Sequence, residues 1–133
     1  MTYQVRSGPL SWDEAERLYP DLRYELHDGV VVAKEPSPFT PHQRTVGQLF
    51  YLLKRYTEDH PDVGEAFVAP YDVKFRAEAP AIVFQPDVLF VSAARAGQVE
   101  NYLSGAPDLA VEVVSPSSVR ADLIYKRNRY ATF

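Results

Sequence analysis

Two carboxylates interrupt an apolar run in the segment PDLAVEVV, residues 107–114. Alternate residues of a strand share a face, so Asp108 and Glu112 are expected on one face, with Leu109, Val111 and Val113 in the core. At about 3.3 Å per residue the two acids lie roughly 13 Å apart, too far to bind one ion together. A buried carboxylate is costly without a partner. Glu112, in mid-strand, is therefore the functional candidate, while Asp108 stands at the strand entrance, where a simple turn residue is the alternative.

A third carboxylate, Asp87, follows Pro86 at the start of another apolar run, QPDVLFVS. If the strands 87–91 and 108–114 are neighbours, Asp87 and Glu112 converge on one point. Two close carboxylates repel each other, and a shared divalent cation stabilises both. Oxygen ligands suit Mg²⁺ or Mn²⁺ better than zinc. The sequence has no cysteine, which excludes thiolate catalysis and cysteine-based zinc sites.

A lysine in the last predicted helix adds a cation to this set. Asp122, Lys126 and Tyr130 are spaced four residues apart and form one helical stripe. The helix directly follows the strand of Glu112, so the ammonium group can reach back over that strand. There it would stabilise a developing oxyanion or position a nucleophilic water. The alternative is a pair between Lys126 and Asp122 on a solvated face.

The elements that must position these residues follow from hydrophobic patterning. SWDEAERL carries a capping box between Ser11 and Glu14 and predicts a helix over about 12–19. RYELHDGVVVAKE predicts a hairpin with a two-residue turn at Asp28-Gly29.

The longest predicted helix covers about 41–58, with Thr40 as N-cap and Gln43 closing a second capping box. Its apolar stripe, at helical spacing, consists of Val46, Leu49, Phe50, Leu53 and Tyr56.

From residue 64 onward the pattern changes to strands. EAFVAP and YDVKFRA are expected to pair with each other, and AIVFQPDVLFVS, interrupted at Pro86, and PDLAVEVVS follow. A final helix begins near residue 119, capped by Ser117 or Ser118. This order of elements predicts an α/β or α+β fold.

Length and composition indicate one domain over residues 1–133. The 46% hydrophobic content suits a single compact core. No apolar run approaches 18 residues, and the N-terminus lacks a signal-peptide core, so we expect no membrane association and a cytoplasmic location. The chain stops at KRNRYATF, within a helical pattern, which predicts a truncated C-terminus. An uncovered sheet edge would then favour a homodimer.

The net charge of −4 limits how the chain could bind DNA, since proteins that bind nucleic acid are usually basic. Binding would require a local basic patch. The last helix supplies one, in which Lys126 is accompanied by the candidate substrate-binding residues Arg120, Arg127 and Arg129. A solvated helix face is the plainer interpretation of the same residues.

Five segments, in order, resemble the Uma-type restriction-endonuclease-like family of the PD-(D/E)XK nuclease superfamily. They are YELHDG, PSPFTPH, QPDVLFV, PDLAVEVVSPSS and the D-x-x-x-K-x-x-x-Y pattern of the last helix. The resemblance implies a restriction-endonuclease-like fold, a mixed central β-sheet flanked by helices, with the N-terminal helix and hairpin added. It also implies hydrolysis of DNA phosphodiester bonds with Mg²⁺ or Mn²⁺.

The resemblance also assigns roles by position. Asp87, Glu112 and the backbone carbonyl of Val113 would hold the metal ion, and Lys126 would complete the catalytic set. A secondary pocket would contain Glu25, His42 and Asp108. His27 and His60 match no position of the family.

One departure from the superfamily pattern concerns the lysine of E-x-K, whose place is taken by Val114. Relatives carry the lysine on the following helix, where Lys126 stands. Together with the acidic pI, Val114 favours the alternative of a non-catalytic nucleic-acid-binding or protein-binding module. Two local alternatives also stand: His42 hydrogen-bonded to Thr40, and Glu25 in a surface pair with Arg23 or Lys34.

Overall fold

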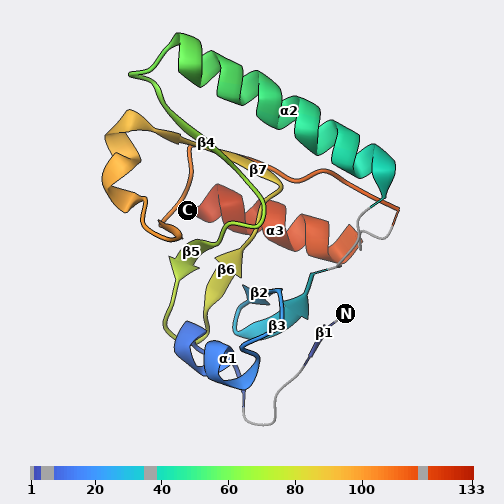
Figure 1. Ribbon diagram of the computed structural model, residues 1–133. Coiled ribbons are helices and arrows are strands. Elements are labelled where there is room, and N and C mark those ends of the chain that lie inside the picture. Colours follow the sequence, from blue (N-terminus) through green and yellow to red (C-terminus); the bar gives the residue numbers. More distant parts are fainter. Residues whose placement is uncertain (1, 4–7, 35–38, 117–119) are drawn as a thin grey trace.

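The computed structural model describes residues 2–3, 8–34, 39–116 and 120–133, which form a mixed α+β arrangement (Figure 1). The predicted caps Ser117 and Ser118 lie outside these residues. The elements follow one another as β1 (Thr2–Tyr3), α1 (Trp12–Leu18), β2 (Tyr24–His27), β3 (Val30–Ala33), α2 (Thr40–Asp59), β4 (Gly64–Val68), β5 (Val73–Arg76), β6 (Ile82–Phe84), β7 (Val88–Ser92), the 3₁₀ helix η1 (Ala93–Gln98), β8 (Leu103–Ser104), β9 (Leu109–Val111) and α3 (Arg120–Thr132).

The strands of the described residues divide into two sheets. One has the order β1-β3-β2-β6-β5-β8 and the other β4-β7-β9. The β5–β8 pair is parallel and the others are antiparallel, which confirms the expected mixed pairing. Two sheets thus take the place of one continuous central sheet.

The predicted pairing of EAFVAP with YDVKFRA is wrong, because β4 pairs with β7, while β5 pairs with β6 and β8. The backbone gives the reason. The N–H of Ala69 donates to the carbonyl of Asp87 at 3.0 Å, which prolongs the β4–β7 ladder up to Pro70. Pro70 has no N–H to continue that ladder, and the chain passes from one sheet to the other.

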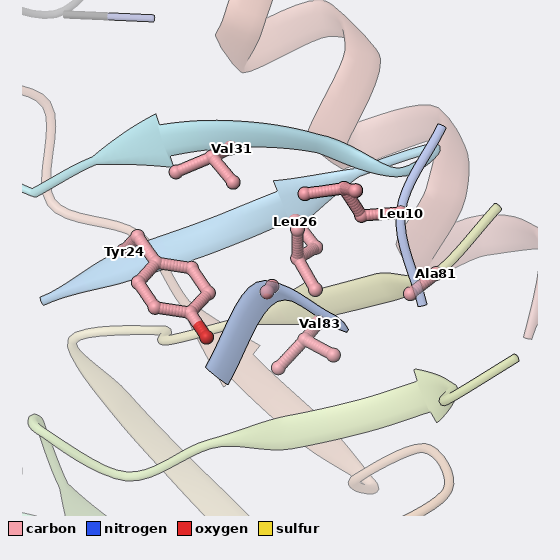
Figure 2. Close-up of a cluster of buried hydrophobic side chains, with 7 residues drawn as sticks. Leu10, Tyr24, Leu26, Val31, Ala81 and Val83 are labelled. Carbon is pink, nitrogen blue, oxygen red and sulfur yellow. The ribbon is translucent and has the colours of Figure 1, made fainter. Parts of the chain in front are cut away.

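The N-terminal helix and hairpin form as predicted and share a core. In the capping box of α1, the Glu14 N–H donates to Ser11 Oγ at 3.1 Å and the Ser11 N–H donates to Glu14 Oε1 at 3.0 Å. The hairpin turn places Asp28 and Gly29 at φ of 49° and 82°. A Cβ at Gly29 would overlap Pro9, so only glycine fits there. Figure 2 shows the cluster beneath, made of Leu10, Ala15, Tyr24, Leu26, Val31, Ala81 and Val83.

Helix α2 lies along the outer side of β4 and β7 (Figure 1). Its predicted start is wrong in detail: Phe39 is the N-cap, Thr40 is already helical, and among the described residues no side chain caps the helix. Val46 and Thr57 are buried on the sheet side, while Tyr56, predicted for the buried stripe, is half exposed. Pro41 in the first turn has no N–H, so one fewer donor is left unpaired at the start of the helix.

The other end of the chain departs from prediction at β9. This strand ends at Val111, so Glu112 lies one residue beyond it and not in mid-strand. Leu109, predicted for the core, is 45% exposed. β9 is short and forms the edge of its sheet next to β7, so its alternate residues do not all reach the core. Within the described residues, no helix combines the length and apolar character needed to cross a membrane.

Candidate active site

Two acidic residues stand at the same end of the β7–β9 pair. The register pairs Val88 with Val111, and Asp87 and Glu112 lie one residue beyond them. The predicted adjacency of the two strands is confirmed. The Asp87 N–H donates to the Val111 carbonyl at 3.0 Å, and Asp87 Oδ2 accepts from the Val113 N–H at 2.7 Å. Asp87 is thus fixed on both sides of Glu112, by its backbone N–H at Val111 and by its carboxylate at Val113.

Lys126 brings α3 onto this strand end. Its Nζ donates to both carboxylate oxygens of Glu112, each at 2.7 Å, and to Glu25 Oε2 at 2.7 Å. Lys126 is only 6% exposed. The alternative pair with Asp122 on a solvated face is therefore wrong. The ammonium joins two carboxylates from distant parts of the chain.

Glu25 is held from several sides within β2. It is 3% exposed, and its Oε2 also accepts from the Gln85 N–H at 2.7 Å. Lys34 lies 3.6 Å from the same oxygen. The alternative pair of Glu25 with Lys34 therefore forms, but the carboxylate of Glu25 is buried and the pair is not a surface pair. Glu25 thus lies in the same cluster as Glu112 and Lys126.

His27 also belongs to this cluster, although sequence reasoning gave it no role. Its Nε2 lies 2.9 Å from Glu25 Oε1. The ring stacks on Tyr125 at a centroid distance of 4.9 Å and meets the edge of Phe84 at 5.2 Å. The available signal was the two-residue spacing from Glu25, which places both side chains on one face of the strand.

His42 approaches Asp87 from the first turn of α2. Its Nε2 lies 3.4 Å from Asp87 Oδ1, and its Nδ1 lies 3.2 Å from Gln43 Oε1. The contact partners of the ring are therefore Asp87 and Gln43, and not Thr40, the partner in the alternative interpretation. Asp87 and His42 form one side of the site, and Glu25, Glu112 and Lys126 form the other.

Burial and neighbouring charges have opposing effects on the pKa values of the charged residues in this cluster. Burial raises the pKa of Glu112, and the negative charge of Glu25 raises it further, against the pull of Lys126. Burial would also raise the pKa of Glu25, but Lys126, His27 and Lys34 together lower it below its usual value. Although burial acts against its charged form, Lys126 has a raised pKa because it faces both carboxylates.

The pKa of the Tyr130 hydroxyl is affected by all the nearby acidic residues. Its hydroxyl donates to Glu112 Oε1 at 3.4 Å. Burial raises its pKa well above the usual value, and the charges of Glu112, Glu25 and Asp87 raise it further. Three carboxylates from three elements therefore act on one buried hydroxyl.

This donor set fits a hard divalent cation. Asp87 and Glu112 supply carboxylate oxygens at one strand end, and the backbone of Val113 is directly adjacent. In the part of the chain that the structure describes, no three acidic, histidine or cysteine side chains group as a metal cage. Mg²⁺ commonly uses one or two carboxylates plus waters and substrate oxygens, so two carboxylates suffice.

A cavity of about 340 Å³ opens beside Glu112 and Lys126. Its walls combine aromatic rings with two arginines, and the lining includes Phe75, Tyr130, Phe133, Arg95, Arg127 and Asp108. Asp108 is set in the wall by the Ser92 N–H, which donates to Oδ2 at 2.6 Å, and by Arg95, whose Nε lies 3.5 Å from Oδ1.

The three arginines of α3 lie in different surroundings. Arg127 lines the cavity, and the side chains of Arg120 and Arg127 form no ion pair or hydrogen bond with the other described residues. Arg129 Nη2 instead donates to both oxygens of Asp28, at 2.7 and 2.8 Å. Tyr125 donates to the same carboxylate at 3.0 Å, and Arg76 lies 3.4 Å from it. Sequence reasoning placed Asp28 in a turn but missed this second cluster.

Comparisons with known proteins match the chain to a family model and to a solved structure. A family model, Uma2, described as "Putative restriction endonuclease", matches residues 12–132. A solved structure, titled a putative nuclease belonging to DUF820 from Anabaena variabilis ATCC 29413, superposes with a TM-score of 0.72 at 18% identity. The match covers 93% of this chain and 69% of that one, and at this identity it establishes the shared fold. No curated protein matches the sequence.

Proposed function

The chain belongs to the Uma2 family, whose description is "Putative restriction endonuclease", and on this premise we propose that it is a metal-dependent endonuclease that hydrolyses phosphodiester bonds of DNA. One observation carries the proposal: Asp87 and Glu112 stand together at one strand end, with the Lys126 ammonium on Glu112. The nuclease fold of the superposed neighbour is consistent with it.

The metal site of this proposal consists of Asp87, Glu112 and the carbonyl of Val113. A bound Mg²⁺ or Mn²⁺ would make a water more acidic and offset charge on the phosphate. The excess of acid suits a cation, since the site has three carboxylates and two lysines. Lys34 and Lys126 contact Glu25 and Glu112, whereas Asp87 contacts only His42 among the charged groups of the described residues.

Lys126 would orient the attacking water or stabilise negative charge on the phosphate. The carboxylates of Glu25 and Glu112 hold its ammonium for this task, and each is itself fixed by a neighbour. Glu25 anchors the ammonium from β2, and His27 fixes the other oxygen of Glu25. Tyr130 donates to Glu112 and holds that carboxylate toward the cluster. Lys126 would thereby take the role of the E-x-K lysine, whose position is occupied by Val114.

DNA would approach over α3 and the cavity beside the cluster. Arg127, with Arg95 in the cavity wall, offers cationic groups for phosphates next to Glu112. Arg120 lies on the same helix and is exposed. With a net charge of −4, binding rests on these few residues and should weaken steeply with salt.

A plasmid-nicking assay in Mg²⁺ and in Mn²⁺ tests the proposal. We expect wild type to nick DNA and the variants Asp87→Ala and Glu112→Ala to lose nicking. Glu65→Ala, an exposed acid on β4, is the matched control and should nick as wild type does. Variants of Asp87 and Glu112 that cut as well as wild type would refute the proposal.

A second candidate is a non-catalytic nucleic-acid-binding or protein-binding module. Val114, at the position of the E-x-K lysine, is 66% exposed, and this observation favours the alternative. The two candidates differ in metal binding. Calorimetric titration with Mn²⁺ should give a binding isotherm for wild type and none for Glu112→Gln if the enzyme proposal holds. Identical flat titrations for both proteins would favour the binding module.

A further inference from the structure

Helix α2 carries apolar side chains on the side that faces away from the sheets. Tyr51 and Leu52 are 54% and 52% exposed, whereas Val46 and Thr57 on the opposite side are buried. The helix lies at the periphery of the molecule, along β4 and β7 (Figure 1). No described residue covers the outward side.

The exposed residues of this side form one continuous face, which we call the outer stripe of α2. At about 100° per residue, they lie within one third of the helix circumference. The stripe consists of Arg44, Gln48, Tyr51, Leu52, Arg55 and Asp59, all of them exposed. Spacings of three and four residues along it are those of helices that pack against another helix.

The charged groups of the outer stripe have no partners among the residues that the structure describes. Within the described part of the chain, the side chains of Arg44, Arg55 and Asp59 enter no ion pair or hydrogen bond. The stripe therefore has unpaired charges at its ends and apolar groups at its centre.

The order of residues along the stripe is self-complementary. Against an identical antiparallel helix, Tyr51 would meet Leu52, Gln48 would meet Arg55 and Arg44 would meet Asp59. Each pair would occur twice about a two-fold axis, as an isologous interface requires. A parallel helix would set Arg44 against Arg44 and Arg55 against Arg55, which is repulsive.

From this pattern the geometry points to the outer stripe of α2 as a homodimer interface, occupied by the antiparallel α2 of a second copy. This face differs from the uncovered sheet edge that the sequence suggested for self-association. The inference does not depend on the proposed function. A DNA duplex is a poorer occupant, because Asp59 and the neighbouring Glu58 would face its phosphates.

The expected dimer is weak and depends on concentration. A helix of 20 residues is about 30 Å long, so a pair of such faces falls at the small end of protein interfaces, below about 1,200 Å². Two Arg44–Asp59 pairs add specificity for the antiparallel arrangement more than they add affinity.

Sedimentation equilibrium over a concentration series tests the inference. Wild type should follow a monomer–dimer equilibrium. Arg44→Asp and Asp59→Arg should each weaken dimerisation about tenfold, because two attractive contacts become repulsive. The double variant Arg44→Asp/Asp59→Arg should restore the wild-type equilibrium, since its charges are again complementary. A monomer at every concentration, or a double variant no better than the single ones, would overturn the inference.

Two further variants separate the stripe from its surroundings. Leu52→Asp should abolish the dimer, and circular dichroism should show that the exposed substitution leaves the fold intact. Lys54→Glu, on the flank of the same helix, should leave the equilibrium unchanged. If Arg44→Asp weakens DNA binding but not self-association, the stripe is a nucleic-acid surface and the homodimer interface is refuted.

Discussion

Two ion clusters fasten α3 to the hairpin of β2 and β3, and they differ in burial and in charge balance. In the inner cluster, Lys126 lies between the buried Glu25 and the largely enclosed Glu112. In the outer cluster, Arg129 and Arg76 share the partly exposed Asp28. Together with Asp87 beside it, the inner cluster has three carboxylates and two lysines, Lys34 and Lys126, whereas the outer one has one carboxylate and two guanidinium groups. A cluster that only fastens a helix needs no surplus acid, so the surplus marks the inner one as the candidate for cation chemistry.

The largest difference between the two clusters should appear when Lys126, the cation of the inner cluster, is removed. Lys126→Met removes the ammonium that Glu25 and Glu112 share and leaves Glu112 without its ion-pair partner, while Glu25 keeps His27 and the more distant Lys34. We expect a loss of about 3–5 kcal/mol in the free energy of unfolding. Urea unfolding at neutral pH measures it, and nicking should be lost as well. The loss should shrink as the pH falls, because protonation of Glu112 relieves the repulsion. A stability loss independent of pH would contradict this explanation.

Removing the charge of Glu112 in the inner cluster should instead reduce activity while leaving stability nearly unchanged. Because burial and the charge of Glu25 raise the pKa of Glu112, the protein already disfavours its ionised form. Glu112→Gln should therefore change the free energy of unfolding by no more than about 1 kcal/mol, since Glu25 still pairs with Lys126. Nicking should nevertheless fall at least about a hundredfold. Unfolding and nicking assays on the same preparation measure both, and retention of activity would contradict the assigned role.

The matching change in the outer cluster should be small. Arg129→Met removes a partly exposed pair, and we expect a loss of about 0.5–1 kcal/mol in the free energy of unfolding. Nicking at low salt should stay close to the wild-type rate. A large loss of activity with unchanged stability would show that Arg129 contacts the substrate, as the sequence suggested, and is not only a fastener.

The smallest expected effect concerns the titration of Tyr125, in the outer cluster, at alkaline pH. Burial and the hydrogen bond to Asp28 raise the pKa of Tyr125 from 10.0 to about 12. The folded state holds this proton longer, so the stabilisation is complete below pH 10 and is lost as the pH rises through about 12. Phenolate absorbance during an alkaline titration should show a late tyrosine in wild type that is missing in Tyr125→Phe. The same titration profile in both proteins would contradict the shifted pKa.

Local signals in the sequence predicted the elements and part of the site. The capping box at Ser11 and the turn at Asp28-Gly29 are encoded within a few residues, and both form as expected. Two apolar runs predicted the strands of Asp87 and Glu112 and suggested that they are neighbours, although Glu112 was expected in mid-strand and lies just beyond the end of β9. Partners of β4 and β5 could not be read in this way, because a strand pattern does not specify which strand lies beside it.

Long-range contacts account for what the sequence did not reveal. Lys126 meets Glu25, and Arg129 meets Asp28, across 101 residues in each case. Both pairings depend on how α3 docks on the hairpin, which no local pattern describes. The family resemblance placed Glu25 near the site, but it offered nothing for His27 or Asp28. Their roles emerge only from the tertiary arrangement.

The position of Lys126 on a helix has a consequence for synthesis of the chain. A lysine at position 114 would leave the ribosome together with Glu112, whereas Lys126 follows fourteen residues after Glu112. The proposed site is therefore completed only after α3 has emerged and docked against β2. A nascent chain that has made both acidic strands still lacks the cation, so cleavage would be withheld until α3 has docked.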